Sequence, residues 1–269
     1  MESESVWLGP LRGPVRTAAI GFGALAVLMA LWLIVGHFWR DAPIGMHDML
    51  RPEGRAEVWL MHGLLMAALL SVSLYLSDNI GRIESTPQGF FDTLSLVTSR
   101  LAMMGVIFTV LVMFYEVVAR YVFGSPTLWA NELSLWIASF LFLFAGQYAM
   151  QQRSHIRIYL IYDVMPRWLQ KSCDVFSTVL ICLFSFAIIW GGFNEAWSKM
   201  LRWETFGTAW DPPLPATLKP AILIIIALVA IQAISNLIAD WNRAPEHHSP
   251  ADEIDQTEIE NIRRTLEDK

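Results

Sequence analysis

The chain has 269 residues, of which 55% are hydrophobic and only 16% are charged. Soluble proteins carry about 25% charged residues, so this composition excludes an ordinary soluble protein and indicates that lipid surrounds much of the chain. The formal charge of −6 at pH 7 comes largely from the acidic C-terminal tail. It therefore gives no basic surface for nucleic acid.

Six apolar stretches are long enough to cross a membrane, because a bilayer core of about 30 Å needs about 20 residues in helical conformation. They cover residues 17–38, 58–76, 101–118, 128–149, 175–194 and 220–238. The first stretch is too long for the apolar core of a signal peptide and lacks a small-residue cleavage site, so we expect a retained span. The predicted fold is an all-α polytopic membrane protein with six transmembrane helices.

Lys and Arg residues near the ends of the spans predict the orientation of the chain in the membrane. With a cytoplasmic N-terminus, 12 of the 19 Lys and Arg residues fall in inner segments and seven in outer loops. This bias favours a cytoplasmic location for both termini.

Two histidines, His37 and His62, stand near the ends of the first two spans on the same side of the membrane. Imidazoles at similar depth on neighbouring helices could ligate a haem, which would make the chain a membrane-bound redox subunit. The alternative is that both bond to backbone groups or water near the headgroups. Cys173 and Cys182 lie nine residues apart on one predicted helix, a spacing that suits packing better than a disulfide or a metal site.

The third span has an apolar lead-in and a stripe of small and polar residues. The apolar residues of this lead-in are spaced three or four positions apart, as on one face of a helix, and this spacing predicts an interfacial helix before the span. These residues are Phe90, Phe91, Leu94 and Val97. The stripe suits packing against protein more than against lipid. Its members are Gly105, Thr109, Val112, Glu116 and Arg120.

Three ionisable side chains, Glu116, Arg120 and Glu132, are the centre of the predicted site. Glu116 and Arg120 lie four residues apart, so they share one helix face and can neutralise each other where a lone charge would be costly. Gly124 and Pro126 predict a tight reversal of the chain before Glu132. We therefore expect Arg120 to pair with both carboxylates and to fix the third span to the fourth.

The fourth span carries a second polar stripe, which we expect to face the first stripe or a shared partner. Its members are Trp129, Glu132, Trp136, Ser139, Leu143, Gly146 and Gln147. The run QQRSHIRI follows, in which Arg153, His155 and Arg157 form a basic cluster. The alternative for this cluster is ordinary anchoring by positive charge on the cytoplasmic side.

The segment between the fifth and sixth spans is the least membrane-like part of the chain. Its prolines at 212, 213 and 215 argue against a regular helix directly after it. Because tryptophan favours the headgroup level, we expect this segment to lie flat on the outer face as a lid. Its docking surface would consist of Trp197, Trp203 and Trp210.

No apolar stretch is broken midway by a Gly or Pro pair, and no G-x-x-x-x-G-K motif occurs in the sequence. These features mark the solute sites of many transporters and the phosphate sites of nucleotide-binding proteins. We therefore expect no catalytic, cofactor-binding or metal site in this chain.

Four segments resemble the small membrane subunit of tripartite ATP-independent periplasmic (TRAP) transporters. They are EVVARYVFGSPTLWANEL at 116–133, the region around Gly146, HIRI at 155–158 and ETFGTAWDPPLPATLKP at 204–220. The resemblance covers roughly residues 92–239, four of the six spans. The first two spans are extra relative to the usual four-span form, and Tyr159 stands where the family often has an acidic residue.

The resemblance implies a non-catalytic subunit in the bacterial inner membrane that scaffolds a large permease and helps to dock a periplasmic solute-binding protein. Sodium ions and the solute, an organic acid or a related compound, would bind to the large subunit. The expected regions are a cytoplasmic head (1–16), two extra spans (17–91), a small-subunit-like domain (92–241) and a charged cytoplasmic tail (242–269). The expected clamp and subunit interface comprises Glu116, Arg120, Trp129, Glu132, Trp136, Gln147 and His155. The alternatives are the haem-binding redox subunit and a stand-alone channel or carrier.

Overall fold

The computed structural model describes residues 5–52, 54–80, 84–153, 162 and 165–242, and within these ranges the chain contains helices but no strand. A short 3-10 helix (Gly9–Leu11) leads into the α-helices. These are α1 (Arg12–Gly36), α2 (Met46–Leu50), α3 (Ala56–Ser77), α4 (Phe90–Tyr121), α5 (Ala130–Gln151), α7 (Arg167–Leu201) and α8 (Leu214–Asp240). All of these α-helices except α2 are long and apolar enough to cross a membrane, which confirms the predicted all-α fold with six candidate spans.

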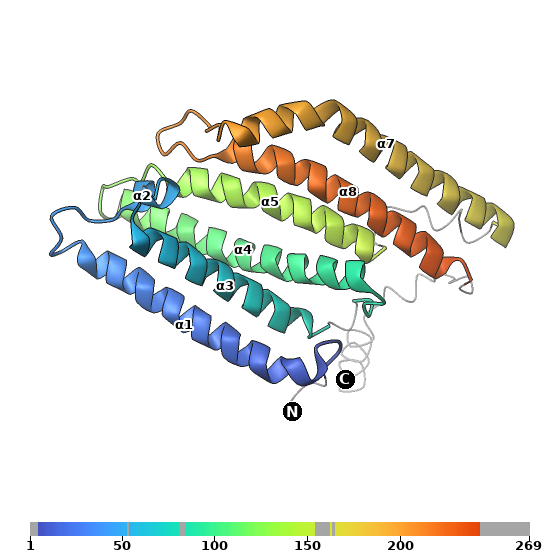
Figure 1. Ribbon diagram of the computed structural model, residues 1–269, viewed down its shortest axis with the longest axis horizontal. Coiled ribbons are helices and arrows are strands. Elements are labelled where there is room, and N and C mark those ends of the chain that lie inside the picture. The colour runs from blue at the N-terminus through green and yellow to red at the C-terminus, as the bar shows by residue number, and fades with distance from the viewer. Residues whose placement is uncertain (1–4, 53, 81–83, 154–161, 163–164, 243–269) are drawn as a thin grey trace, which may run out of the picture.

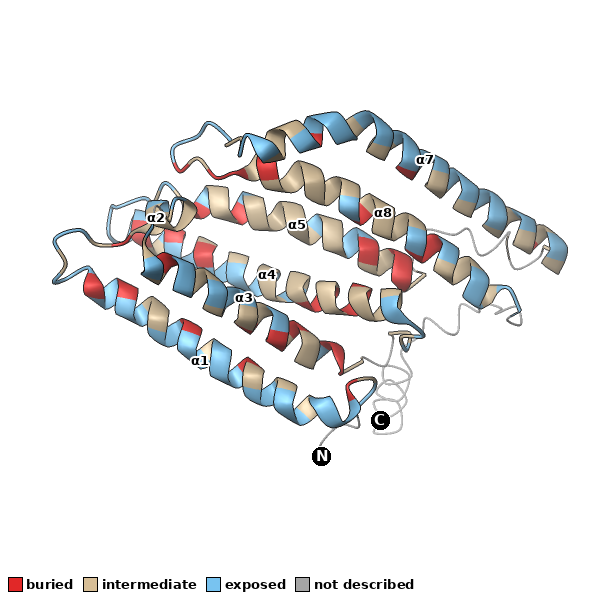
Figure 2. Ribbon diagram, in the orientation of Figure 1, coloured by how far each residue is buried: buried red, intermediate tan, exposed pale blue. Residues whose placement is uncertain are grey.

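The six long helices stand side by side in a single layer (Figure 1). The order across the layer is α1, α3, α4, α5, α8, α7, because α8 packs between α5 and α7. A single layer has little interior, and only 6% to 17% of the residues in the most apolar part of each span are buried. Figure 2 accordingly shows exposed and half-buried residues along every helix. The broad faces of the layer are thus apolar surfaces, available to lipid or to another protein.

The layer has two rims. Figure 1 shows α2, the α4–α5 turn and the α7–α8 loop (residues 202–213) together at one rim, which we call the α2 rim. The start of α1 and the ends of α3, α5 and α8 lie at the opposite rim, which we call the N-terminal rim.

The last two helices extend beyond their predicted bounds. α7 has 35 residues and is therefore about 52 Å long, well beyond the roughly 30 Å of a bilayer core. α8 begins at Leu214 with Pro215 in its first turn, where the missing N–H group has no helical partner to lose. The prolines therefore start this helix, and the expectation that they would prevent one was wrong.

The predicted lead-in to the third span forms the first turns of α4, which is one continuous helix. Asp92 lies in the first turn, where its carboxylate offsets the helix dipole, and its Oδ2 accepts the N–H of Gln88 at 3.0 Å. The position of these turns at the membrane surface stays a prediction.

The chain before α1 is folded onto Asp78, the residue that ends α3. Asp78 Oδ1 accepts the N–H groups of Val6, Trp7 and Leu8 at 2.9–3.0 Å, and its Oδ2 pairs with Arg12 at 3.0 Å. Burial alone would raise the pKa of Asp78, but the hydrogen bonds outweigh it and hold the pKa below its usual value. The predicted end of the head at residue 16 falls inside α1, which begins at Arg12.

Candidate functional site

The Glu116 carboxylate fastens α4 to the turn that leads into α5. One oxygen accepts a hydrogen bond from Arg120 Nε at 3.0 Å, and the other accepts the N–H of Thr127 at 2.9 Å. The Thr127 hydroxyl also donates to this second oxygen. Gly124, at φ +63°, allows the sharp reversal that brings Thr127 back to the helix. The pairing of Glu116 with Arg120, predicted from their helical spacing, is therefore confirmed.

Glu132 does not join this pair, which corrects the expected three-residue clamp. Its Oε2 accepts the Thr208 hydroxyl at 2.7 Å and the N–H of Asp211 at 3.2 Å, both from the α7–α8 loop. Both oxygens of Glu116 are already occupied by Arg120 and Thr127, while Glu132 in the first turn of α5 meets several donors from the loop. The three side chains therefore form two separate attachments at the α2 rim.

Trp129 and Trp136 both have partners within the chain. Trp129 stacks on Tyr115 of α4 with a centroid distance of 5.8 Å. Trp136 donates its indole N–H to the Thr217 hydroxyl of α8 at 2.9 Å. These two contacts join α5 to its neighbour on either side of the layer.

The three tryptophans expected on the docking surface differ in exposure. Trp203 lies in the α7–α8 loop and is 57% exposed, and Trp197 lies in α7 and is 51% exposed. Trp210 is only 4% exposed, because it packs edge-on against Trp136 and donates its indole N–H to the Met46 carbonyl at 2.9 Å. The assignment of Trp210 to an exposed docking surface was therefore wrong.

The α7–α8 loop carries two carboxylates with lowered pKa values. The hydrogen bond from Gly207 N–H, together with the charge of Arg51, holds the pKa of Asp211 below its usual value. The side-chain bond from Lys199 does the same for the pKa of Glu204. Both groups are therefore anionic at neutral pH and act as acceptors that shape the loop.

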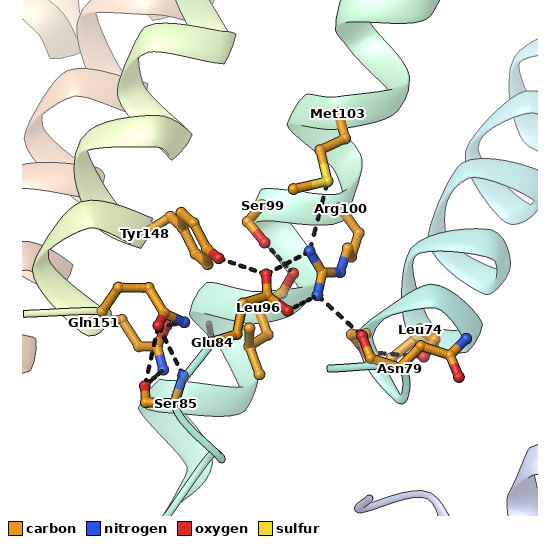
Figure 3. Close-up of polar contacts among 12 residues, drawn as sticks. Leu74, Asn79, Glu84, Ser85, Leu96, Ser99, Arg100, Met103, Tyr148 and Gln151 are labelled. Carbon is orange, nitrogen blue, oxygen red and sulfur yellow. Dashed lines mark hydrogen bonds and ion pairs between the residues drawn. The ribbon is translucent and has the colours of Figure 1, made fainter. Parts of the chain in front are cut away.

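A buried ion pair at the N-terminal rim was missed by the sequence reasoning. Figure 3 shows Arg100 of α4 facing Glu84, with hydrogen bonds of 2.9 and 2.6 Å between the guanidinium and the two carboxylate oxygens. Arg100 also donates to the Asn79 carbonyl at 3.0 Å, and the Tyr148 hydroxyl of α5 donates to Glu84. The side chains of Arg100 and Glu84 are only 9% and 10% exposed. The position of Arg100 among serines near the start of α4 was the signal in the sequence that could have revealed this pair.

Gln147 is buried between α4 and α5, so it does not lie on an exposed interface. It is 2% exposed, its carbonyl accepts the Ser95 hydroxyl at 3.3 Å, and its side-chain oxygen lies 3.5 Å from the Thr98 hydroxyl. A polar side chain in an apolar layer is stabilised by such bonds to the neighbouring helix. The expected role of Gln147 in contact with another subunit is therefore not supported by its position.

The two histidines that could ligate a haem show no feature specific to that role. His62 shares a hydrogen bond with the Val58 carbonyl at 2.8 Å, and exposed His37 caps the end of α1. Bonding of the ring to a backbone carbonyl was the alternative expectation, and the structure shows it for His62. Among the described residues, no three His, Cys, Asp or Glu side chains are placed to hold a metal ion. His155 lies outside the described residues.

A hollow of about 350 Å³ lies between α5, α7 and α8. Its walls are apolar side chains such as Leu180, Phe184 and Ile226, with the Ser185 hydroxyl as a polar exception. An organic acid needs charged or hydrogen-bonding partners for its carboxylates, so this hollow does not suit one.

Comparison with known proteins places the α4–α8 part of the layer in a family. Residues 109–243, half of the chain, match the family of tripartite ATP-independent periplasmic transporters, DctQ component. The chain is also similar to the C4-dicarboxylate TRAP transporter small permease protein DctQ of Vibrio cholerae serotype O1, with 23% identity over 109 residues. That alignment covers 40% of this chain and 47% of the Vibrio protein, so the chain spans about half the length of this relative. No solved structure matches the chain.

The family match includes Glu116, Glu132 and the α7–α8 loop, whereas α1, α2 and α3 lie outside it. Family membership and the six apolar helices together indicate a multi-pass inner-membrane component of a transporter, which is not an enzyme. The chain therefore belongs to the DctQ family, the small permease subunits of TRAP transporters.

Proposed function

We propose that this chain is a non-catalytic scaffold for a large TRAP permease, and that its α2 rim helps to dock a periplasmic solute-binding protein. The complex would import an organic acid or a related solute together with sodium ions, which bind in the large subunit. The name of the Vibrio relative makes a C4-dicarboxylate the first solute to test.

The observation that carries the scaffold proposal is the single layer of helices. Its polar side chains turn toward neighbouring helices, as shown by Glu116, Gln147 and Gln232, which are 4%, 2% and 1% exposed. Bulky apolar side chains occupy the open surfaces. A layer that buries so little surface against itself offers a broad area for a second membrane protein.

Gly146, which lies inside the family match, supports α5 as part of the surface that this protein would approach. A Cβ atom added at Gly105 of α4 would lie 3.3 Å from Ile137, so this glycine permits close packing within the chain. A Cβ atom at Gly146 would meet nothing within 4 Å. Because a glycine inside a helix costs about 1 kcal/mol relative to alanine, an open glycine favours close approach by another chain. Exposed Ala145 beside it extends this surface of small residues.

The docking proposal relies on exposed aromatic residues at the α2 rim. Trp203 and Phe206 of the α7–α8 loop are 57% and 44% exposed. Aromatic side chains in such positions are enriched at the centres of protein interfaces. With both termini in the cytoplasm, this rim would face the periplasm.

Copurification with the large permease of the same transport system tests the scaffold. Gly146→Leu places a bulky side chain where the partner would approach, and overpacking of about 1–3 kcal/mol should weaken binding of the large subunit roughly 5- to 150-fold and lower its recovery. Gly21→Leu is the matched control, since Gly21 is also a helical glycine with nothing within 4 Å but lies in α1, outside the family match. Equal recovery of the large subunit with both variants would exclude α5 as the contact surface.

A further inference from the structure

The α1–α3 pair lies outside the family match, yet the segment between its helices contacts the α7–α8 loop, which lies inside that match. Arg51, just after α2, pairs with Asp211 at 3.0 Å. The Met46 carbonyl in α2 accepts the indole N–H of Trp210 at 2.9 Å. Two contacts therefore join the part of the chain without a family match to the loop at the α2 rim.

The α2 segment is itself fixed to the α1–α3 pair. Leu33 of α1, Ile44 before α2 and Val58 of α3 form a buried apolar cluster, and Met49 of α2 packs on it. Within the segment, Asp48 accepts the N–H of Gly45 at 2.7 Å, which closes the first turn of α2. A segment with a buried anchor and a closed helical turn can hold a neighbouring loop in place.

The α7–α8 loop needs such support because its backbone is strained. Trp203 and Asp211 have backbone φ angles of +49° and +61°, in a region that residues other than glycine rarely adopt. Such conformations persist when surrounding contacts fix them. Glu132 of α5 supplies contacts from the family-matched side, and α2 supplies them from the other.

We propose that the α1–α3 pair, acting through α2, is a brace that holds the α7–α8 loop in the conformation that presents Trp203 and Phe206 to the periplasmic solute-binding protein. Arg51 and Trp210 are its positioning residues. The contacts that form the brace lie within this chain and do not depend on any partner. Only the presentation of Trp203 and Phe206 rests on the proposed docking function. The two extra spans thereby acquire a role that the family match does not give them.

The mobility of the loop tests the brace on the full chain in lipid nanodiscs. A spin label at Ala209→Cys, in a chain whose two cysteines are replaced by serine, reports on the exposed tip of the loop. Arg51→Ala combined with Trp210→Phe removes both contacts and should at least double the mobile fraction of the spectrum. Arg55→Ala is the matched control, because Arg55 pairs with Asp48 inside the α2 segment, and it should leave the spectrum unchanged.

Ionic strength gives a readout that general loosening of the fold would not reproduce. The Arg51 side chain is 47% exposed, so added salt weakens its ion pair with Asp211. The mobile fraction of the parent chain should rise with salt, and Arg51→Ala should reduce that rise, leaving only the part due to other ion pairs of the loop such as Lys199 with Glu204. Arg51→Ala changes an exposed residue, so the chain is expected to fold, and a salt response as large as that of the parent chain would overturn the role of Arg51.

The brace and the proposed docking function fail in different ways. If the double variant and the parent give superimposable spectra, the brace is wrong, whatever the complex does. If the loop loosens but solute uptake by the reconstituted complex is unchanged, presentation to a partner is refuted. If the unmodified chain fails to bind a large permease, the scaffold proposal fails, although the mobility results still decide whether the brace exists.

Discussion

Replacing Glu84 by alanine should destabilise the chain more than removal of any surface ion pair. The change leaves the Arg100 guanidinium, only 9% exposed, without its carboxylate, and deprives the Tyr148 hydroxyl of its acceptor. Removing one partner of a buried ion pair costs about 3–5 kcal/mol. At about 2–4 °C per kcal/mol for a chain of this size, the melting temperature should fall by roughly 6–20 °C.

Thermal unfolding of the purified chain in one detergent measures this effect. Glu57→Ala is the matched control, since Glu57 pairs with Arg40 at 2.9 Å but is 43% exposed, and such pairs contribute about 0–1 kcal/mol. The double variant Glu84→Leu/Arg100→Met should be more stable than Glu84→Ala, because no buried charge is left unpaired. A melting temperature for Glu84→Ala within about 2 °C of the control would refute the reasoning.

Three further predictions follow from single contacts. Asp78→Asn should lower the melting temperature by a constant amount from pH 8 to pH 5, and the difference from the parent chain should shrink only below about pH 4. The pKa of Asp78 is lower in the folded chain than its usual value of 3.8, so its stabilisation is complete above that value and is lost as the pH falls. A difference that shrinks between about pH 7 and pH 5 would contradict this. Glu116→Gln should lower the melting temperature more than Arg120→Ala, since it disturbs the bonds to both Arg120 and Thr127, and a reversed order would exclude Glu116 as the centre of the attachment. Gly105→Leu should destabilise the isolated chain by about 1–3 kcal/mol through a clash with α5, and an unchanged melting temperature would rule out close packing there.

Short-range contacts were predictable from the sequence, and contacts across the layer were not. Glu116 and Arg120 follow from helical spacing alone. The partner of Glu132, Thr208, lies 76 positions away, and the acceptor of the Trp210 indole lies 164 positions away. Those pairings depend on the order of the helices in the layer, in which α8 packs beside α5. The sequence does not reveal this order, because α7 and α8 are both apolar and either could occupy the place beside α5.

The exposure of the tryptophans shows the same limit on a smaller scale. The sequence shows that the segment before α8 is rich in aromatic residues, and its position at a membrane surface stays a prediction. Burial of one of them depends on whether another segment covers it, and α2, from the part of the chain without a family match, covers Trp210. Trp203, only seven positions earlier, has no such cover and stays exposed.

The distribution of polar contacts explains how a single layer of helices can hold together and still receive a partner. Lipid is as apolar as the helix surfaces, so neighbouring helices are joined by packing and by hydrogen bonds more than by burial of apolar area. Strong bonds between elements lie at the rims, with Glu84 and Arg100 at one rim and Glu132 and Thr208 at the other. The broad faces between the rims carry apolar side chains and the open position at Gly146. The proposed large subunit could therefore pack on these faces without displacing the contacts that fix the order of the helices.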